Sequence, residues 1–281
     1  MAAAVWYDGR WHDEQPRILG PMDHAFWMAS VVFDGARSFS RLAPDLDRHC
    51  ARVVRSAESL LLRPTHDARE IELLAREGIL RFPADAELYV RPMFFAMAGF
   101  VVPEPASTRF ALVLHDVPMP KPAGASITFS RYRRPTPETA PTDAKASCLY
   151  PIMQRALSEV RAQGFDNAVT LDANGNVAEL ASANIWMVKG GVAMTPVANG
   201  TFLAGITRLR VMDLLRRDGI EAVEATLGRR DLEEADELFS TGNWGKVLPI
   251  TRIDRRELPI GPVTRRAREL YMAFAADQRV G

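Results

Sequence analysis

The sequence predicts an α+β protein with two domains. Hairpin patterns that close at Asp-Gly, Asn-Gly or Gly-Gly pairs alternate with helical patterns along the 281 residues, which is typical of α+β domains and not of a doubly wound parallel sheet. Residues 118–124 are too rich in proline for a helix or a strand, and we expect them to form a linker. We therefore expect a small N-terminal domain over residues 1–117 and a larger domain over residues 125–281.

The expected N-terminal domain begins with a hairpin over residues 5–11 that turns at Asp8-Gly9. The apolar run over residues 26–33 then predicts a buried strand. The remaining elements expected here are two helices, at residues 45–62 and 66–82, where apolar residues recur at helical spacing, and two strands, at residues 87–95 and 108–114.

The expected larger domain begins with a strand over residues 126–131, followed by a loop with three prolines. Two hairpins are predicted, one over residues 169–180 that turns at Asn174-Gly175 and one over residues 185–194 that turns at Gly190-Gly191. Three helices are expected over residues 150–164, 206–218 and 263–276, the second of which ends at the cap residue Gly219.

The composition narrows the class of protein. Lys and Arg together number 35, as do Asp and Glu, so the formal net charge is zero and we expect no nucleic-acid or membrane partner bound by bulk electrostatics. The longest apolar stretches are far shorter than a membrane span, and no leader pattern opens the chain. Two cysteines, Cys50 and Cys148, cannot make a disulfide framework, which fits a cytoplasmic protein.

Several familiar site patterns are excluded. The five histidines are scattered without ligand spacing, so we expect no metal site. The stretch Thr241-Gly242-Asn243-Trp244-Gly245-Lys246 lacks the spacing of a phosphate loop, and no Gly-x-Ser-x-Gly or Gly-x-Gly-x-x-Gly motif occurs.

Lysine chemistry has few candidates, because only four of the 35 basic residues are lysines. Lys145 is flanked by small residues and precedes an apolar helix, so partial desolvation could lower its pKa and free the amine as a nucleophile. A solvated loop lysine would fit the same pattern. The other three lie in the linker (Lys121), at a hairpin turn (Lys189) and in a polar turn (Lys246), and suggest less.

Two further features follow Lys145 in the sequence. Glu179 is the only charge in a run of small and apolar residues, so it is either a buried carboxylate that needs a cationic partner or an outward-facing strand residue. Gly205-Ile206-Thr207 opens a helix, whose free amides could bind a phosphate or simply be capped by Thr207.

Together these features resemble a known family. The matching segments are Val32-Phe33-Asp34-Gly35-Ala36-Arg37, Leu46-Asp47-Arg48, Tyr89-Val90-Arg91-Pro92, Gly164-Phe165-Asp166-Asn167-Ala168, Gly175-Asn176-Val177 with Glu179 and Asn184, and Leu203-Ala204-Gly205-Ile206-Thr207-Arg208. In these segments, spread over nearly the whole chain, the sequence resembles the fold-type IV, pyridoxal-phosphate-dependent aminotransferases, which include branched-chain and D-amino-acid aminotransferases. The resemblance implies a small α+β domain, a larger pseudo-barrel domain, a cofactor between them, and a homodimer or larger homo-oligomer.

The resemblance also assigns roles to residues. It implies that Lys145 is the Schiff-base lysine and shuttles a proton between the substrate Cα and the cofactor, and that Glu179 faces the pyridine nitrogen. The remaining cofactor contacts that it implies are Tyr150 to the phenolic oxygen and Arg48, Ile206, Thr207 and Asn243 to the phosphate. The substrate-binding residues that it implies are Phe33, Arg37, Tyr89, Arg91 and Trp244.

Departures from the branched-chain pattern leave the substrate open. They lie at Met28, Asp34, Leu149, Asn243 and Trp244, none of which alters Lys145 or Glu179. We expect transfer of an amino group from a branched-chain or similar hydrophobic L-amino acid to 2-oxoglutarate by a ping-pong mechanism. The alternatives are a transaminase of the same fold for (R)-amines or D-amino acids, a lyase that cleaves aminodeoxychorismate, and a binding protein that keeps the fold without the cofactor.

Overall fold

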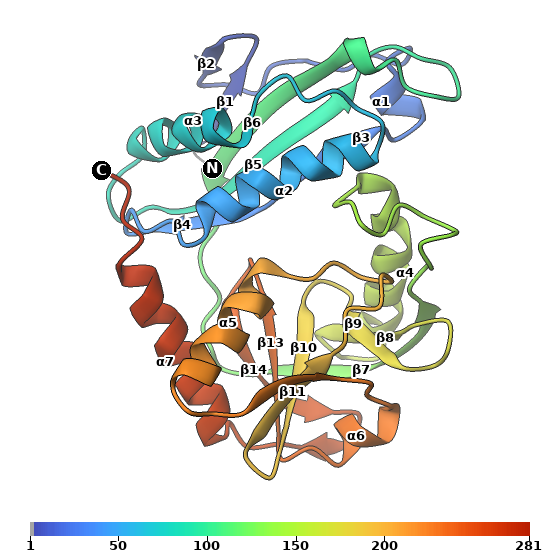
Figure 1. Cartoon of the computed structure of the whole chain (residues 1–281), viewed down its shortest axis with the longest axis vertical. Coiled ribbons are helices and arrows are strands. Elements are labelled where there is room, and N and C mark those ends of the chain that lie inside the picture. Colours follow the sequence, from blue (N-terminus) through green and yellow to red (C-terminus); the bar gives the residue numbers. More distant parts are fainter. Residues whose placement is uncertain (1–2) are drawn as a thin grey trace. The chain divides into compact units, whose positions relative to one another are not determined.

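The computed structural model describes residues 3–281, and the chain divides into two compact units (Figure 1). Unit 1 consists of the chain up to Met119 together with Asp143–Leu149 and Ala275–Gly281, and unit 2 consists of Pro120–Thr142 and Tyr150–Phe274. The chain first passes from unit 1 to unit 2 inside the expected linker, residues 118–124. Unit 2 differs from the expected larger domain because two segments of that domain pack with unit 1.

Unit 1 is built on a six-stranded sheet in the order β2-β1-β6-β5-β3, with β4 also paired to β5, and all its pairs are antiparallel. The strands are β1 Ala3–Tyr7, β2 Arg10–His12, β3 Val31–Phe33, β4 Ala36–Phe39, β5 Glu87–Ala96 and β6 Thr108–Asp116. The helical elements are α1 His24–Trp27, α2 Leu46–Ser59, α3 Ala68–Leu80 and the 3-10 turns η1 Pro105–Ser107 and η2 Ser147–Leu149.

Helices α2 and α3 lie side by side across one face of this sheet (Figure 1). A reciprocal capping box starts α3, in which the Asp67 side chain accepts from the Glu70 amide and the Glu70 side chain accepts from the Asp67 amide, both at 2.8 Å. Gly78 allows close packing, because a Cβ at this position would overlap Leu114 of β6. Leu114 therefore faces the helices, and its neighbour His115 projects to the opposite face of the sheet.

Most predicted elements of this unit are confirmed, and one is wrong. The first hairpin turns with Asp8 at φ 52° and Gly9 at φ 77°, as an Asp-Gly turn requires. The strand predicted over residues 26–33 is limited to Val31–Phe33. Phe26 and Trp27 are instead exposed on the single-turn helix α1, and Ala29 adopts a left-handed conformation, at φ 53°, between this helix and the strand. An apolar run alone does not distinguish a buried strand from an exposed apolar surface.

Unit 2 contains a nine-stranded sheet in the order β12-β11-β10-β13-β14-β7-β8-β9, with β15 paired to β14. The strands are β7 Ala125–Arg133, β8 Asn167–Leu171, β9 Val177–Leu180, β10 Asn184–Lys189, β11 Val192–Pro196, β12 Ala222–Ala225, β13 Glu237–Gly242, β14 Lys246–Ile253 and β15 Arg256–Glu257. The end strand β9 also packs against β10 and β11, so the sheet curls back on itself. This half-barrel confirms the predicted fold class.

The helices of unit 2 are α4 Tyr150–Arg161, α5 Ile206–Arg217, α6 Arg229–Glu233 and α7 Pro262–Ala276, whose last two residues belong to unit 1. The two predicted hairpins are confirmed, since Gly175, Gly190 and Gly191 all adopt positive φ. Inside the half-barrel, an apolar core forms from residues that include Ile127, Val169, Leu180, Ile185, Leu238 and Ile250. Across residues 3–281, no helix is both long enough and apolar enough to cross a membrane.

Candidate active site

Lys145 lies in a short irregular segment that is fixed to unit 1. Its amide donates to the Ser56 hydroxyl on α2 at 3.0 Å, and its carbonyl accepts from the Phe33 amide at 3.0 Å. The next residue, Ala146, forms a bridge with Val32 of β3. The side chain is half-buried, and its ammonium nitrogen is 5.1 Å from the centroid of the Phe33 ring. The sheet and α2 thus fix the backbone from which this amine projects.

The four substrate residues expected in unit 1 share one face of its sheet. Arg37 on β4 pairs with Tyr89 on β5, and Arg91 follows two residues along the same strand. Phe33 pairs with Met93, which is two residues beyond Arg91 on β5, and therefore points to the same face. Phe33, Arg37, Tyr89 and Arg91 are therefore neighbours on the face opposite α2 and α3.

Arg37 is held rigidly on this face. Its Nη1 donates to the Val117 carbonyl at 2.7 Å, and its Nε lies 3.4 Å from the Met119 sulfur. Burial lowers the pKa of this guanidinium, while Glu87 and Tyr89 act in the opposite direction. Gly35 permits close approach here, because a Cβ at this position would overlap the Tyr89 hydroxyl.

Two arginines one helical turn apart on α2 differ in burial. The Arg48 side chain is 47% exposed and lies 3.6 Å from Asp45, whereas the Arg52 side chain is 13% exposed. Arg52 donates from Nε and Nη2 to the fully buried Asp34 at 2.6 and 2.9 Å, and His49 Nδ1 approaches the same carboxylate at 2.6 Å. Both arginines face a buried carboxylate, but Arg52 binds its partner through two hydrogen bonds, whereas Arg48 stays half-exposed.

The charge of Asp34 is stabilised by its partners. Burial acts to raise the pKa of this carboxyl, but the positive charges and hydrogen bonds of Arg52 and His49 outweigh it and hold the pKa far below its usual range. The Gly35 amide adds a hydrogen bond of 2.7 Å. Asp34 is therefore ionised throughout the range in which the protein is handled.

Glu179 on β9 is a largely buried carboxylate with a cationic partner. Its side chain is 14% exposed and forms an ion pair of 3.4 Å with Arg134. Asn184 Nδ2 donates to Glu179 at 3.2 Å and to the Leu203 carbonyl at 3.3 Å. The buried alternative weighed from the sequence is thus confirmed, and the outward-facing one is wrong.

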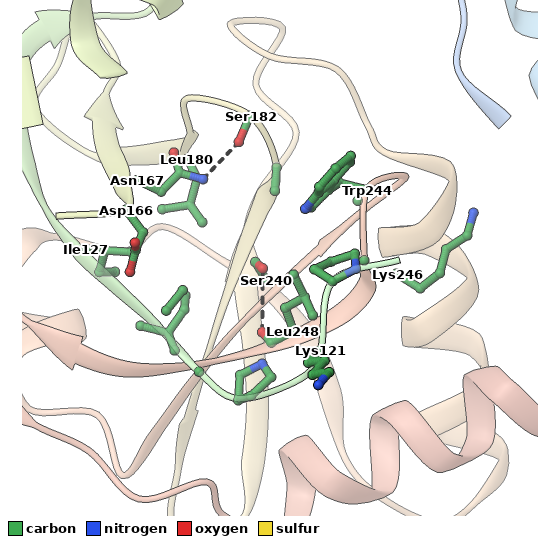
Figure 2. Close-up of a pocket in the computed structure, with 18 of the residues that line it drawn as sticks. Lys121, Ile127, Asp166, Asn167, Leu180, Ser182, Ser240, Trp244, Lys246 and Leu248 are labelled. Carbon is green, nitrogen blue, oxygen red and sulfur yellow. Dashed lines mark hydrogen bonds between the residues drawn. The ribbon is translucent and has the colours of Figure 1, made fainter. Parts of the chain in front are cut away.

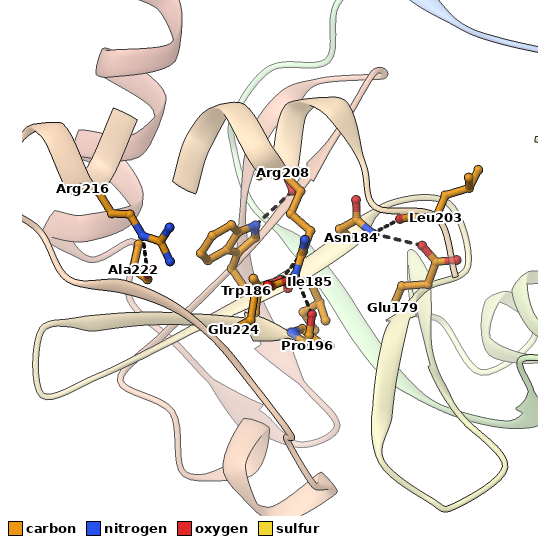
Figure 3. A network of polar contacts seen from close by, with 12 residues as sticks. Glu179, Asn184, Ile185, Trp186, Pro196, Leu203, Arg208, Arg216, Ala222 and Glu224 are labelled. Carbon is orange, nitrogen blue, oxygen red and sulfur yellow. Dashed lines mark hydrogen bonds and ion pairs between the residues drawn. The ribbon is translucent and has the colours of Figure 1, made fainter. Parts of the chain in front are cut away.

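The start of α5 provides donors of the kind an anion needs. The N-cap residue Gly205 has no side chain to cap the helix, and Ile206 and Thr207 are buried in its first turn. A Cβ at Gly205 would overlap Asn184 Oδ1, so a larger residue here would displace the Asn184 side chain. Arg208 anchors this turn by donating to the Pro196 carbonyl at 2.7 Å and to Glu224 at 2.5 Å (Figure 3). The free first-turn amides and the helix dipole favour a phosphate here.

The second expected phosphate turn, between β13 and β14, is fixed by a buried lysine. Lys246 is 1% exposed, adopts φ 62°, and donates from Nζ to Asn243 Oδ1 at 3.0 Å. Arg268 on α7 binds the carbonyls on both sides of it, those of Gly245 at 3.3 Å and Val247 at 2.8 Å. The prediction of an unremarkable Lys246 in a polar turn is therefore wrong.

Trp244 lies on the wall of a cavity of about 320 Å³ within unit 2 (Figure 2). The cavity has an apolar floor that includes Leu180 and Leu248, and its polar wall includes Ser182. Half of the indole is exposed, so it is available to a ligand. Tyr150, the first residue of α4, is half-buried.

Sequence reasoning missed Arg52, Arg134 and Lys246. Arg52 lies one turn after a matched motif, so helical spacing alone could have indicated it. Arg134 and Lys246 gave no comparable signal, since the partner of Arg134 and the α7 residues that pack around Lys246 become neighbours only in the folded chain. Among residues 3–281, no group of three or more His, Cys, Asp or Glu side chains is arranged to hold a metal ion.

Known proteins are similar to this chain over most of its length. A family model described as amino-transferase class IV matches residues 31–253. The branched-chain-amino-acid aminotransferase of Escherichia coli (strain K12) is 30% identical over 287 residues, which cover 96% of this chain and 92% of that protein.

Solved structures are similar in fold. An aminotransferase from Brucella abortus, bound to the co-factor PLP, matches with a TM-score of 0.97 and 50% identity over 98% of this chain and 100% of its own. The branched-chain aminotransferase of Thermoproteus uzoniensis, solved with norvaline, matches with a TM-score of 0.90 and 28% identity over 99% of this chain and 96% of its own.

Proposed function

The chain belongs to the class IV aminotransferase family, and from that premise we propose that it transfers amino groups from branched-chain or similar hydrophobic L-amino acids to 2-oxoglutarate. The family and fold predicted from the sequence are confirmed. The cofactor is pyridoxal 5′-phosphate, as predicted. The donor's 2-oxo product leaves before the acceptor binds, in a ping-pong order.

One observation supports the proposal most strongly. Unit 1 places the half-buried Lys145 amine beside the Phe33 ring, on the same sheet face as Arg37, Tyr89 and Arg91. This face combines an apolar wall with two cations, of which Arg37 is fixed by hydrogen bonds, and it suits a substrate that has an apolar side chain and a carboxylate. We assign Phe33, Arg37, Tyr89 and Arg91, together with Trp244 of unit 2, to substrate binding.

The donor groups of unit 2 fit the cofactor. A carboxylate paired with Arg134 suits a protonated ring nitrogen, so we assign Glu179 to that position. Tyr150 would bind the phenolic oxygen of the cofactor, and the Ile206 and Thr207 amides with the turn at Asn243 would hold its phosphate. When bound, pyridoxal phosphate supplies an electron sink for the carbanion at the substrate Cα.

Lys145 holds the cofactor and moves the proton at the substrate Cα. A general base must lie within hydrogen-bonding reach of that proton, and the backbone bonds of Lys145 to Ser56 and Phe33 fix its reach. Arg37 and Arg91 orient the substrate through its carboxylates while this transfer takes place.

For the arginine at the phosphate we propose two positions on α2. The family resemblance indicates Arg48, whereas burial and the rigid pair with Asp34 favour Arg52. A guanidinium already fixed by a carboxylate loses less side-chain entropy when it binds an anion.

The domains and the assembly are part of the same proposal. We propose a division into a small domain (residues 1–117), a linker (118–124) and a larger cofactor-binding domain (125–281).

Exposed apolar side chains cluster at Phe26, Trp27 and residues 100–102 of unit 1, where the rings of Trp27 and Phe100 are 5.8 Å apart. Such a surface favours a homodimer. Two free cysteines favour the cytoplasm.

The test is the rate of glutamate formation from 2-oxoglutarate with L-leucine, D-alanine or (R)-1-phenylethylamine as donor. We expect L-leucine to be the fastest donor and parallel double-reciprocal plots to show the ping-pong order. The alternative, a transaminase for D-amino acids or (R)-amines, is favoured by the bulk of Trp244 at the cavity wall. Faster turnover of D-alanine or of the amine would overturn the L-amino-acid assignment in its favour.

A further inference from the structure

Arg37, Tyr89 and His115 form a row across three neighbouring strands of the unit 1 sheet. Tyr89 on β5 pairs with Arg37 on β4 and with His115 on β6. The rings of Tyr89 and His115 are 5.6 Å apart, and the Arg91 guanidinium carbon is 5.9 Å from the Tyr89 ring centroid. Three groups that can hold positive charge therefore surround one tyrosine on a single face.

Two buried nitrogen atoms on either side of Tyr89 lack a hydrogen-bond partner. Within the described chain, residues 3–281, these are Arg91 Nε and His115 Nδ1. Buried polar atoms of native proteins nearly all bind a protein group or an ordered water, so these two nitrogen atoms are available to a ligand that binds on this face. Cationic groups with unused hydrogen-bond donors bind anions, and a carboxylate accepts charge-assisted hydrogen bonds from arginine and protonated histidine.

His115 differs from its neighbours because its charge can change near neutral pH. Burial lowers its pKa, the charges of Arg91 and Arg37 lower it further, and Asp116 acts in the opposite direction. The charged or titratable groups near it are Arg37 from β4 and Tyr89 and Arg91 from β5, and the β1 residue that pairs with it is Ala3. Glu87 acts on Arg37 from the same strand as Tyr89. The ring is therefore neutral at pH 7 without a ligand, and a nearby anion favours its protonated form.

We propose that His115 takes up a proton from solvent when the second carboxylate of a substrate binds beside Arg37 and Arg91, so that the preference for dicarboxylic over monocarboxylic substrates rises as the pH falls. The identity of the ligand as a substrate rests on the proposed function. His115 is a specificity-determining residue in this scheme and takes no part in proton transfer at Cα.

The first test is binding of unreactive analogues to the holoenzyme, measured by calorimetry at pH 6.5 in two buffers of different ionisation enthalpy. Glutarate has two carboxylates, and 4-methylpentanoate has one. We expect glutarate to bind with uptake of up to about one proton and 4-methylpentanoate with none, and we expect His115→Gln to abolish the uptake. Absence of uptake in the wild type, or equal uptake in His115→Gln, would overturn the proposal.

The second test is the ratio of kcat/KM for 2-oxoglutarate to that for 4-methyl-2-oxopentanoate, from about pH 5.5 to 8.5. Ionisations of the cofactor cancel, because both acceptors react with the same form of the enzyme. We expect the ratio to rise by at most about tenfold per unit fall in pH and to become independent of pH in His115→Gln.

A matched control is His66→Gln. His66 also has a pKa lowered by burial, but it packs against Phe110 and Trp6 on the helix-covered side of the sheet. This variant should keep the wild-type slope, and loss of the slope here would contradict a specific role for His115. Proton uptake with glutarate in a protein that transaminates no donor would reject the proposed function and leave the role of His115 standing.

Discussion

The two units present their candidate site residues in different ways. Unit 1 offers side chains on one sheet face, among them Arg37, Tyr89 and Arg91. Unit 2 offers mainly backbone, at the start of α5 and at the turn between β13 and β14, together with the carboxylate of Glu179, which is paired with Arg134. A site made of side chains tolerates backbone adjustment but depends on buried charge pairs, whereas a backbone cradle depends on glycine and on packing.

The largest effect is expected at the buried charge pair of unit 1. Replacing Asp34 by Asn leaves the Arg52 charge without its carboxylate and should lower the free energy of unfolding by about 3–5 kcal/mol. Urea unfolding measures this loss, and Asp47→Asn on the exposed side of α2 is the control. A loss below about 1 kcal/mol would mean that the pair contributes no more than a surface ion pair.

The contribution of the Asp34–Arg52 pair to stability has a predictable pH dependence. The pKa of Asp34 is lower in the folded protein than its value near 3.9 in the unfolded chain. Its contribution to stability is therefore complete above about pH 4 and is lost as the pH falls below that value. Asp34→Asn should unfold with a shallower acid dependence than the wild type, and identical acid profiles would contradict this assignment.

In unit 2, the charged residue that corresponds to Asp34 of unit 1 is Glu179, and its substitution tests its role. Glu179→Ala should keep the bound cofactor but lower kcat by roughly 10²–10³-fold, the range for loss of one preorganised electrostatic contact. Stopped-flow measurement of each half-reaction separates this effect from binding. Glu179→Asp should recover part of the rate, and an unimpaired Glu179→Ala variant would exclude the residue from the ring nitrogen.

Substitution of Arg48 and of Arg52 tests which of them binds the phosphate. The family resemblance indicates Arg48, whereas burial favours Arg52. Lysine lacks the planar fork, so at the position that binds phosphate Arg→Lys should weaken binding of pyridoxamine phosphate by about 10- to 100-fold. We expect the larger effect for Arg52→Lys, with exposed Arg55→Lys as the control. A larger effect for Arg48→Lys, measured by equilibrium fluorescence titration, would assign the phosphate to Arg48.

The smallest effect is expected at the backbone cradle. Gly205→Ala places a methyl group against Asn184 Oδ1 and should lower stability by about 1–3 kcal/mol, as overpacking does. Because Asn184 also binds Glu179, the variant should weaken cofactor binding as well. Gly219→Ala, at the end of α5 with open space around it but with φ 82°, controls for backbone strain alone. Equal cofactor affinity in both variants would contradict the cradle.

Local patterns in the sequence were enough to predict much of this structure. The Asp8-Gly9, Asn174-Gly175 and Gly190-Gly191 turns were predicted because each hairpin depends on two or three neighbouring residues. Glu179 was identified as a possible buried charge because no other charge lies near it in the sequence.

Partners brought together by tertiary structure could not be predicted. Arg134 reaches Glu179 from 45 residues away in the sequence, and the burial of Lys246 depends on Arg268 and Tyr271 of α7. His115 was one of five scattered histidines until the sheet register placed it beside Tyr89. The apolar run over residues 26–33 failed for the related reason that burial is decided by the surrounding fold.

The most direct test of the transaminase assignment is the visible absorption spectrum of purified wild type and Lys145→Ala, before and after addition of L-leucine. We expect the wild type to show the absorption band of the lysine-bound cofactor and L-leucine to bleach it. Lys145→Ala should fold with the wild-type circular dichroism spectrum, lack the band, and lose roughly 10²–10⁴-fold or more in transamination rate, the range for loss of a general acid–base group. A variant that retains the band and turns over L-leucine at a rate near that of the wild type would contradict the role of Lys145.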